Sequence, residues 1–163
     1  MPSIVPARMT HDHDGELVVF LIGMRLNRLW RPDLWLPVFA AMPKMLAELS
    51  RDRESGLLGY RILLGAGGPT VVQYWGSAEK LYAYASRPQA EHRPAWTAFN
   101  RRARTVPGAV GIWHETYLVD RAESVYVATP PMGLAAATGS VPVGRRGEGA
   151  AQRLGRAAEE VAA

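Results

Sequence analysis

The segment Leu17–Met24 constrains the fold more than any other part of the chain. It is almost entirely apolar and rich in β-branched and aromatic residues, and Gly15 and the polar Arg25 lie just outside it. This pattern predicts a short strand. Because residues of both parities are apolar, both faces of the strand must be covered. Any sheet that contains this strand therefore needs a layer on each side.

Apolar spacing and turn residues predict the other elements. Leu57–Leu64 and residues 70–76 read as two strands of a hairpin, because the Gly-rich residues 65–69 between them suit a turn. Ser77 is placed to cap the helix that follows. The remaining predicted elements are a helix over 33–51 kinked at Pro43, helices over 78–87 and 94–105, a strand over 109–119 and a short strand over 124–129.

The order strand, helix, strand, strand, helix pair, strand predicts an α+β fold. It is the order of a ferredoxin-like βαββαβ sheet with its helices on one face. With no residues left for a further layer, we expect the same sheet of a second copy to cover the other face, giving a homodimer. We expect three parts: a mobile N-terminal arm over 1–15, the α/β domain over 16–132, and an Ala/Gly/Arg-rich C-terminal tail over 133–163.

Composition excludes several classes of site. The chain has no cysteine, which rules out disulfides, cysteine-ligated zinc, iron–sulfur clusters and a cysteine nucleophile. We interpret Arg101–Arg104 as a solvated helix end rather than a nucleic-acid site, and His11–Asp14 as an exposed arm rather than a metal site. There is no apolar run of about 20 residues and no secretory signal. We expect a cytoplasmic protein without nucleic-acid, membrane or metal partners.

The most informative stretch for chemistry is Val110–Tyr117, which contains His114 beside Glu115. Adjacent side chains of a strand point to opposite faces, so these two cannot form a catalytic dyad with each other. Each needs a partner from elsewhere in the fold.

A second set of candidates lies on the helix predicted over 94–105. Trp96 and Asn100 share a helical face, and His92 lies just before that face begins. These residues would form one wall of an aromatic pocket for a small organic substrate, in which His92 or His114 acts as general base. A structural interpretation stands beside each role: apolar packing for the aromatic residues, and hydrogen bonding at helix or strand ends for the polar ones.

The opposite wall would come from the strands, through Gln73 or Tyr74 together with His114 or Glu115. Arg25 follows the first strand and is a candidate for holding a carboxylate or enolate of the substrate. Its alternative role is a salt bridge to Glu115 or another acid.

Four segments taken together resemble a known family. They are Phe20–Asn27, Gly68–Trp75, His92–Asn100 and Val110–Tyr117. They are similar to a bacterial and fungal family that was long catalogued as a domain of unknown function and is now labelled monooxygenase-like, after a fungal member of fumagillin biosynthesis. The resemblance covers roughly residues 15–137 and leaves out the tail after Val141.

The resemblance implies the dimeric α/β-barrel fold of the antibiotic-biosynthesis monooxygenases. It also implies oxidation of an electron-rich, secondary-metabolite-type substrate by O₂ without a cofactor. Two alternatives stay open. One is a haem enzyme of the same fold class, like the aldoxime dehydratases, with His92 or His114 as the iron ligand. The other is a non-catalytic protein that binds a small apolar metabolite.

Overall fold

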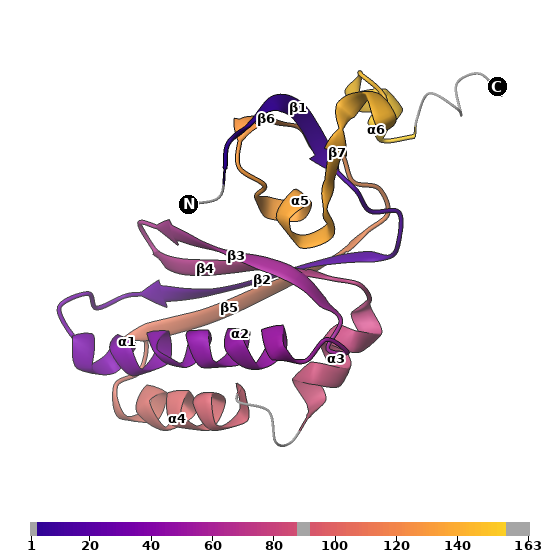
Figure 1. The fold of residues 1–163 in the computed structure, drawn as a ribbon. Coiled ribbons are helices and arrows are strands. Elements are labelled where there is room, and N and C mark those ends of the chain that lie inside the picture. The colour runs from indigo at the N-terminus through magenta and orange to yellow at the C-terminus, as the bar shows by residue number, and fades with distance from the viewer. Residues whose placement is uncertain (1–2, 88–91, 156–163) are drawn as a thin grey trace.

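The computed structural model describes residues 3–87 and 92–155, and the side chains of 92–95 lie outside the described part. Two antiparallel sheets and a layer of helices make up this part of the chain (Figure 1). The elements in chain order are β1 (Val5–His11), β2 (Leu17–Leu26), α1 (Pro32–Phe39), α2 (Ala41–Arg51), β3 (Leu57–Gly65), β4 (Gly68–Trp75), α3 (Ala78–Ser86), α4 (His92–Thr105), β5 (Val110–Val119), β6 (Tyr126–Thr129), α5 (Gly133–Thr138), β7 (Ser140–Pro142), the 3₁₀ turn η1 (Val143–Arg145) and α6 (Ala150–Arg153).

The main sheet has the strand order β3-β4-β2-β5, and every neighbouring pair is antiparallel. Two strands that are adjacent in the chain, β3 and β4, form an edge hairpin, whereas the first strand of the core, β2, lies inside the sheet. Helices α1 to α4 lie on one side of it (Figure 1). This is the predicted ferredoxin-like α+β arrangement, and the prediction is confirmed.

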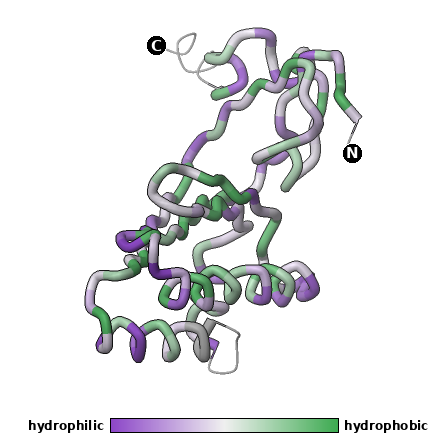
Figure 2. The backbone as a smooth tube through the Cα atoms, turned by 90° about the vertical axis from the view of Figure 1, so that its left-hand side faces the viewer, coloured by the Kyte–Doolittle hydropathy of each residue, from purple (hydrophilic) through white to green (hydrophobic). Residues whose placement is uncertain are grey.

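The hydrophobic core lies between the centre of this sheet and the helices. Val18 of β2 and Trp75 of β4 are fully buried, and they pack against Leu49 of α2 and against Leu81 and Tyr84 of α3. Figure 2 shows hydrophobic segments in the centre of the molecule and mixed segments along the helices below it. The Ser77 hydroxyl accepts a hydrogen bond from the Lys80 amide and caps α3, as predicted.

The helix predicted over 33–51 is interrupted, as the kink expected from Pro43 implied, and the break comes three residues before this proline. The chain breaks after Phe39, at Ala40, and Pro43 lies in the first turn of α2. A continuous helix would place the Pro43 ring against the carbonyl of Phe39 and would leave that carbonyl without its amide donor. Ending one helix at Phe39 and starting another places Pro43 where no amide is needed.

The second sheet as a whole was not predicted, although the short strand expected over 124–129 is present in it as β6. It changes the interpretation of both ends of the chain. It has the order β6-β1-β7, so it joins residues 5–11 to residues 126–129 and 140–142. The predicted arm over 1–15 therefore contains a strand, and the predicted tail over 133–163 contains α5, β7 and α6. Residues 156–163 lie outside the described part. The strands β1 and β7 are short and contain few apolar residues, so their sequences show no periodic pattern. Pairing with distant segments of the chain stabilises them instead.

The outer face of the main sheet, opposite α1 to α4, is partly covered by this second unit. Helix α5 contacts β3, and a Cβ added to Gly59 of β3 would lie 2.9 Å from the Ala137 Cα. The expectation that no residues remain to cover this face was wrong at the β3 end. At the β5 end Trp113 and Tyr117 stay exposed. None of the helices in the described part combines the length and the apolar character that crossing a membrane requires.

Candidate functional site

His114 and Glu115 leave β5 on opposite faces of the main sheet. The register pairs His114 with Ile22 and Glu115 with Leu21. Phe20, which shares the parity of Ile22, packs against the core beneath the helices, and the rings of Phe20 and His114 lie 5.7 Å apart. His114 therefore faces the helix side, and Glu115 faces outward. The structure supports the inference that the two do not form a dyad.

The helix side of the sheet is closed at its centre and open along β5. On β4, Val71 is 2 % exposed, whereas on β5 Leu118 is 72 % exposed and His114 is also exposed. Helix α4 contacts α1 and α2 rather than packing closely on a strand. We call the helix-facing residues of β5 the open strip: Ile112, His114, Thr116 and Leu118. Within the described residues, the His114 side chain has no hydrogen-bond partner, so its ring nitrogens are available.

Helix α4 lies on the same side of the sheet as the open strip (Figure 1). Its Trp96 ring stacks on Phe99 with 5.5 Å between centroids, and Trp96 is still 51 % exposed. Asn100 is half-buried one turn further along. His92 is the first residue of α4, and its side chain lies outside the described part. The structure thus places His114, Trp96 and Asn100 on one side of the sheet.

Gln73 also faces the helix side, but its amide already has a partner. Its Oε1 accepts a hydrogen bond of 2.9 Å from Trp75 Nε1, and Gln73 is 5 % exposed. A buried amide that satisfies a buried indole is part of the packing of the core. The structure gives Gln73 no route to a substrate on the open strip.

Tyr74 and Arg25 face outward, away from His114. A Cβ added to Gly133 of α5 would lie 3.5 Å from both Tyr74 Oη and Arg61 Nη1, so Tyr74 lies beneath α5. Arg25 lies between the β3–β4 turn and the start of β5. The predicted wall that combined these residues with His114 is not formed, because strand parity separates them.

The predicted salt bridge between Arg25 and Glu115 is also absent among the described residues. Glu115 is paired in register with Leu21, four residues along β2 from Arg25 and so about 13 Å away. Instead, Glu115 Oε2 accepts a hydrogen bond of 2.8 Å from the Tyr117 hydroxyl on the same face.

Two tyrosines of the outer face are held in their neutral form. The hydrogen bond to Glu115, followed by the charge of that carboxylate, raises the pKa of Tyr117. Burial raises the pKa of Tyr74, and the nearby Arg61 guanidinium opposes part of that effect. Neither phenol is suited to act as a base near neutral pH, which leaves the histidines as the better candidates.

A pocket of about 250 Å³ lies elsewhere, at the β3 edge of the main sheet. Residues 57–60 of β3, Ser50 at the end of α2, and Ala136 and Ala137 of α5 line it. None of the predicted site residues contributes to it. The candidate site on the open strip is therefore a surface between β5 and the helix layer rather than this pocket.

A polar cluster in the second sheet joins β1 to the segment before β6. The Ser124 hydroxyl lies 2.8 Å from His11 Nδ1 and 3.4 Å from Thr10 Oγ1, and it accepts a hydrogen bond of 3.2 Å from the His11 amide. His11 and Thr10 are buried, and burial is the main reason why the pKa of His11 is lowered. With every hydroxyl position used, Ser124 acts as a structural link between these two segments.

Sequence reasoning missed the role of Phe20 beside His114. The contact depends on the register between β2 and β5, which are separated by some 90 residues of chain, and no local pattern reports it. The other members of the open strip follow from alternation around His114.

Comparison with known proteins gives a consistent match to one family. The family model described as Monooxygenase af470-like matches residues 17–134. A curated relative, Monooxygenase af470 of Aspergillus fumigatus, is 30 % identical over 165 residues, which cover 90 % of this chain and 55 % of the relative. The chain thus spans about half the length of that relative.

One solved structure shares the fold at low sequence identity. An aldoxime dehydratase in complex with butyraldoxime has a TM-score of 0.61 at 16 % identity, covering 80 % of this chain and 40 % of the other. SnoaB of Streptomyces nogalater, a cofactor-independent oxygenase, has a TM-score of 0.42 at 10 % identity, covering 66 % of this chain and 97 % of its own.

Proposed function

The chain belongs to the af470-like monooxygenase family, and from this membership we propose that it oxidises an electron-rich organic substrate with O₂ and without a cofactor. The family match carries the proposal, because it spans the whole main sheet with α1 to α4. For the location of the reaction we propose the open strip of β5, supported by His114, which is exposed and has no hydrogen-bond partner in the described part of the chain.

In the proposed reaction His114 is the general base. A phenol that carries an activated methylene group loses a proton to the imidazole, and the resulting carbanion passes electrons to O₂. Carbon–oxygen bond formation gives a hydroperoxide, which loses water to leave a carbonyl. Overall CH₂ and O₂ become C=O and H₂O, so the substrate supplies all four electrons. No flavin, haem or metal enters this balance.

The other groups near the open strip have supporting roles in the proposal. Trp96 and Phe99 of α4 offer an aromatic surface for the substrate, and the Asn100 amide can donate a hydrogen bond to the developing anion. The proposal omits four residues that the sequence had suggested: Gln73, which is bonded to Trp75, and Arg25, Tyr74 and Glu115, which lie on the outer face.

We further propose that a second copy covers the exposed β5 end of the outer face. Trp113 and Tyr117 of β5 are 37 and 51 % exposed there. Such a dimer would close the sheet on the side that α5 leaves open.

Oxygen consumption and the absorption spectrum of the purified protein test the proposed reaction together. We expect a colourless protein that consumes ¹⁸O₂ with a phenol that carries an activated methylene group, and that places one ¹⁸O atom in the product carbonyl. A Soret band near about 400 nm after expression with added haem would instead support the haem enzyme. A ligand that binds and is recovered unchanged would support the non-catalytic binding protein.

A further inference from the structure

An exposed apolar segment begins where β2 ends and continues through α1. Trp30 is 75 % exposed and Leu29 60 %, and on α1 Leu36 and Phe39 are 51 and 42 % exposed. No residue of α1 is buried, although most of the helix is apolar. Trp35 Nε1 donates to the Leu29 carbonyl at 3.2 Å, which holds the loop against the helix. We call Leu29, Trp30, Leu36 and Phe39 the apolar lip.

The charge around the apolar lip is almost entirely positive. Residues 25–47 and 96–114 together contain seven lysines and arginines and a single acid, Asp33. Arg31 forms a bidentate pair with that acid, at 2.9 and 2.8 Å, so Asp33 adds little free negative charge. The whole chain has a net charge of +4, so the rest of it is net negative. The exposed cations of this region include Arg28, Lys44, Arg101 and Arg104.

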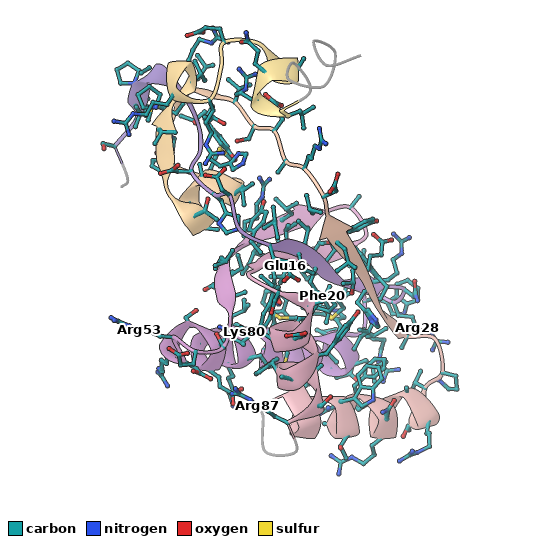
Figure 3. All side chains as sticks on the ribbon, turned by 90° about the vertical axis from the view of Figure 1, so that its right-hand side faces the viewer. Glu16, Phe20, Arg28, Arg53, Lys80 and Arg87 are labelled. Carbon is teal, nitrogen blue, oxygen red and sulfur yellow. The ribbon has the colours of Figure 1, made fainter. Side chains whose placement is uncertain are left out.

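The fold brings both segments to one end of the molecule. The Asn27 side chain donates to the Gly108 carbonyl at 3.0 Å, and the Asn27 amide donates to the Ala109 carbonyl at 3.1 Å. These bonds tie the loop before α1 to the turn after α4, and α1 contacts α4. Both connections lie at the left of Figure 1, the side that Figure 2 shows from the front, where hydrophobic and hydrophilic segments alternate. In Figure 3 Arg28 lies on the side of the turn between α4 and β5.

We propose that this end of the protein docks on an anionic lipid bilayer. The apolar lip would enter the boundary between headgroups and acyl chains, and the surrounding arginines would bind lipid phosphates. A second copy is a poorer occupant, because it would bring the same positive charges against these. A nucleic acid would satisfy the charge and leave the apolar lip in water.

This mode of binding differs from the membrane partner that the sequence argued against, because it requires no spanning helix. Interfacial binding depends on a few exposed aromatic and aliphatic side chains beside basic ones, brought together by folding. Arg101 to Arg104, which alone read as a helix end, acquire this second role through their place beside α1. The inference does not depend on the proposed oxidation.

Vesicle flotation near neutral pH tests the docking surface. The probes are vesicles of phosphatidylcholine alone and vesicles that also contain phosphatidylglycerol, without any substrate. We expect the full chain to float with the anionic vesicles at low salt and to bind them less as salt rises. Trp30→Ala should weaken binding about tenfold, and Arg101→Gln and Arg104→Gln about fivefold each.

Matched controls lie at the other end of the helix layer. Tyr82 of α3 is 57 % exposed, and Arg53 follows α2 and is exposed (Figure 3 labels it). Tyr82→Ala and Arg53→Gln should bind vesicles like the unmodified protein, and circular dichroism confirms that each variant is folded. If Trp30→Ala does not fold, vesicle binding by the two arginine variants tests the docking surface in its place.

Three results would overturn the docking surface. They are no flotation with anionic vesicles, equal flotation with neutral ones, and Trp30→Ala binding that matches Tyr82→Ala. A Trp30→Ala variant that loses self-association and keeps its vesicle binding would likewise reassign the apolar lip to a protein interface. Flotation is measured without oxygen chemistry, so its failure leaves the proposed reaction unaffected, and the reverse is also true.

Discussion

Trp75 Nε1 donates a 2.9 Å hydrogen bond to Gln73 Oε1 across the buried face of β4. Both residues are at most 5 % exposed, so neither side chain is accessible to water or to a ligand. We expect Gln73→Leu to lower the free energy of unfolding by about 1–3 kcal/mol, because it leaves a buried indole N–H without an acceptor. Urea denaturation measures this.

The double variant Gln73→Leu/Trp75→Phe is the control for that loss. It removes the donor together with the acceptor, so the penalty for an unsatisfied group disappears, and only the change in packing remains. If the stability losses of Gln73→Leu and Trp75→Phe add up to the loss of the double variant, the hydrogen bond contributes nothing to stability.

His114→Ala should separate catalysis from stability. The His114 side chain is exposed, has no hydrogen-bond partner among the described residues, and lies 5.7 Å from the Phe20 ring between centroids. The free energy of unfolding should therefore change by less than about 0.5 kcal/mol. If His114 is the base, O₂ consumption should fall about 10²–10⁴-fold. Tyr82→Ala, at an exposed residue of α3 outside the open strip, is the control and should keep the activity. Full activity in His114→Ala would remove this residue from the mechanism.

The His92→Ala variant distinguishes a catalytic or haem-binding role of His92 from a structural one. As a catalytic base or haem ligand, its loss should abolish function with little change in melting temperature. As a residue that satisfies backbone groups at the start of α4, its loss should keep function and cost about 1 kcal/mol of stability. Equal unfolding of the His92 and His114 variants would favour structural roles for both.

The main sheet could be predicted because its signals are local. Two-sided apolarity in β2, the Gly-rich turn before β4 and the Ser77 cap each depend on a few neighbouring residues. Strand alternation also predicted correctly that His114 and Glu115 point to opposite faces of the sheet. Which of the two meets the helices depends on the packing of Val18 and Trp75, and no spacing within β5 carries that information.

The second sheet could not be predicted for the same reason. Its strands β1 and β7 meet across more than 120 residues of chain, and they contain Pro and polar residues in place of an alternating pattern. The link through Ser124 and His11 spans 113 residues. The first part of the predicted tail forms the helix α5, which packs on Gly59, where the missing side chain allows a close approach.

Acidification should weaken the second sheet through His11. Burial lowers the pKa of this imidazole in the folded protein below its ordinary value of 6.5, and Arg146 adds to that effect. As pH falls through 6.5 the unfolded chain therefore binds a proton first, and stability decreases until the folded pKa has also been passed. We expect melting temperature to drop between neutral pH and about pH 5, before most carboxylates titrate.

His11→Asn is the test of that origin, because the amide keeps an acceptor for Ser124 without a titratable ring. The melting temperature of this variant should change less with pH over the same window. Ser124→Ala keeps the imidazole and should lower the melting temperature while retaining the slope. Parallel curves for the unmodified protein and His11→Asn would assign the pH dependence to another group.

Arg146 should hold the N-terminal segment in place. It forms a bidentate pair with Asp14, at 2.7 and 2.9 Å, and a third bond of 3.2 Å to Asp12. We expect Arg146→Gln to speed amide hydrogen exchange in β1 by about tenfold, and to leave β2 unchanged. Arg8→Gln, which breaks a more exposed pair with Glu148, is the control. Rapid exchange of β1 in the unmodified protein would instead support the mobile arm predicted for residues 1–15.

The proposed dimer predicts that the two faces of β5 respond differently to charge. Tyr117→Arg adds a cation to the outer face, where a second copy would bury it, and should weaken self-association at least about tenfold. Leu118→Arg adds the same cation one residue further along, on the helix side, and should leave the dimer intact. Sedimentation velocity at micromolar concentration distinguishes them. A monomeric unmodified protein would show that the part of this face left open by α5 stays in contact with solvent. Equal weakening of self-association by both variants would instead place the contact at the β5 edge, because only the edge is shared by the two faces.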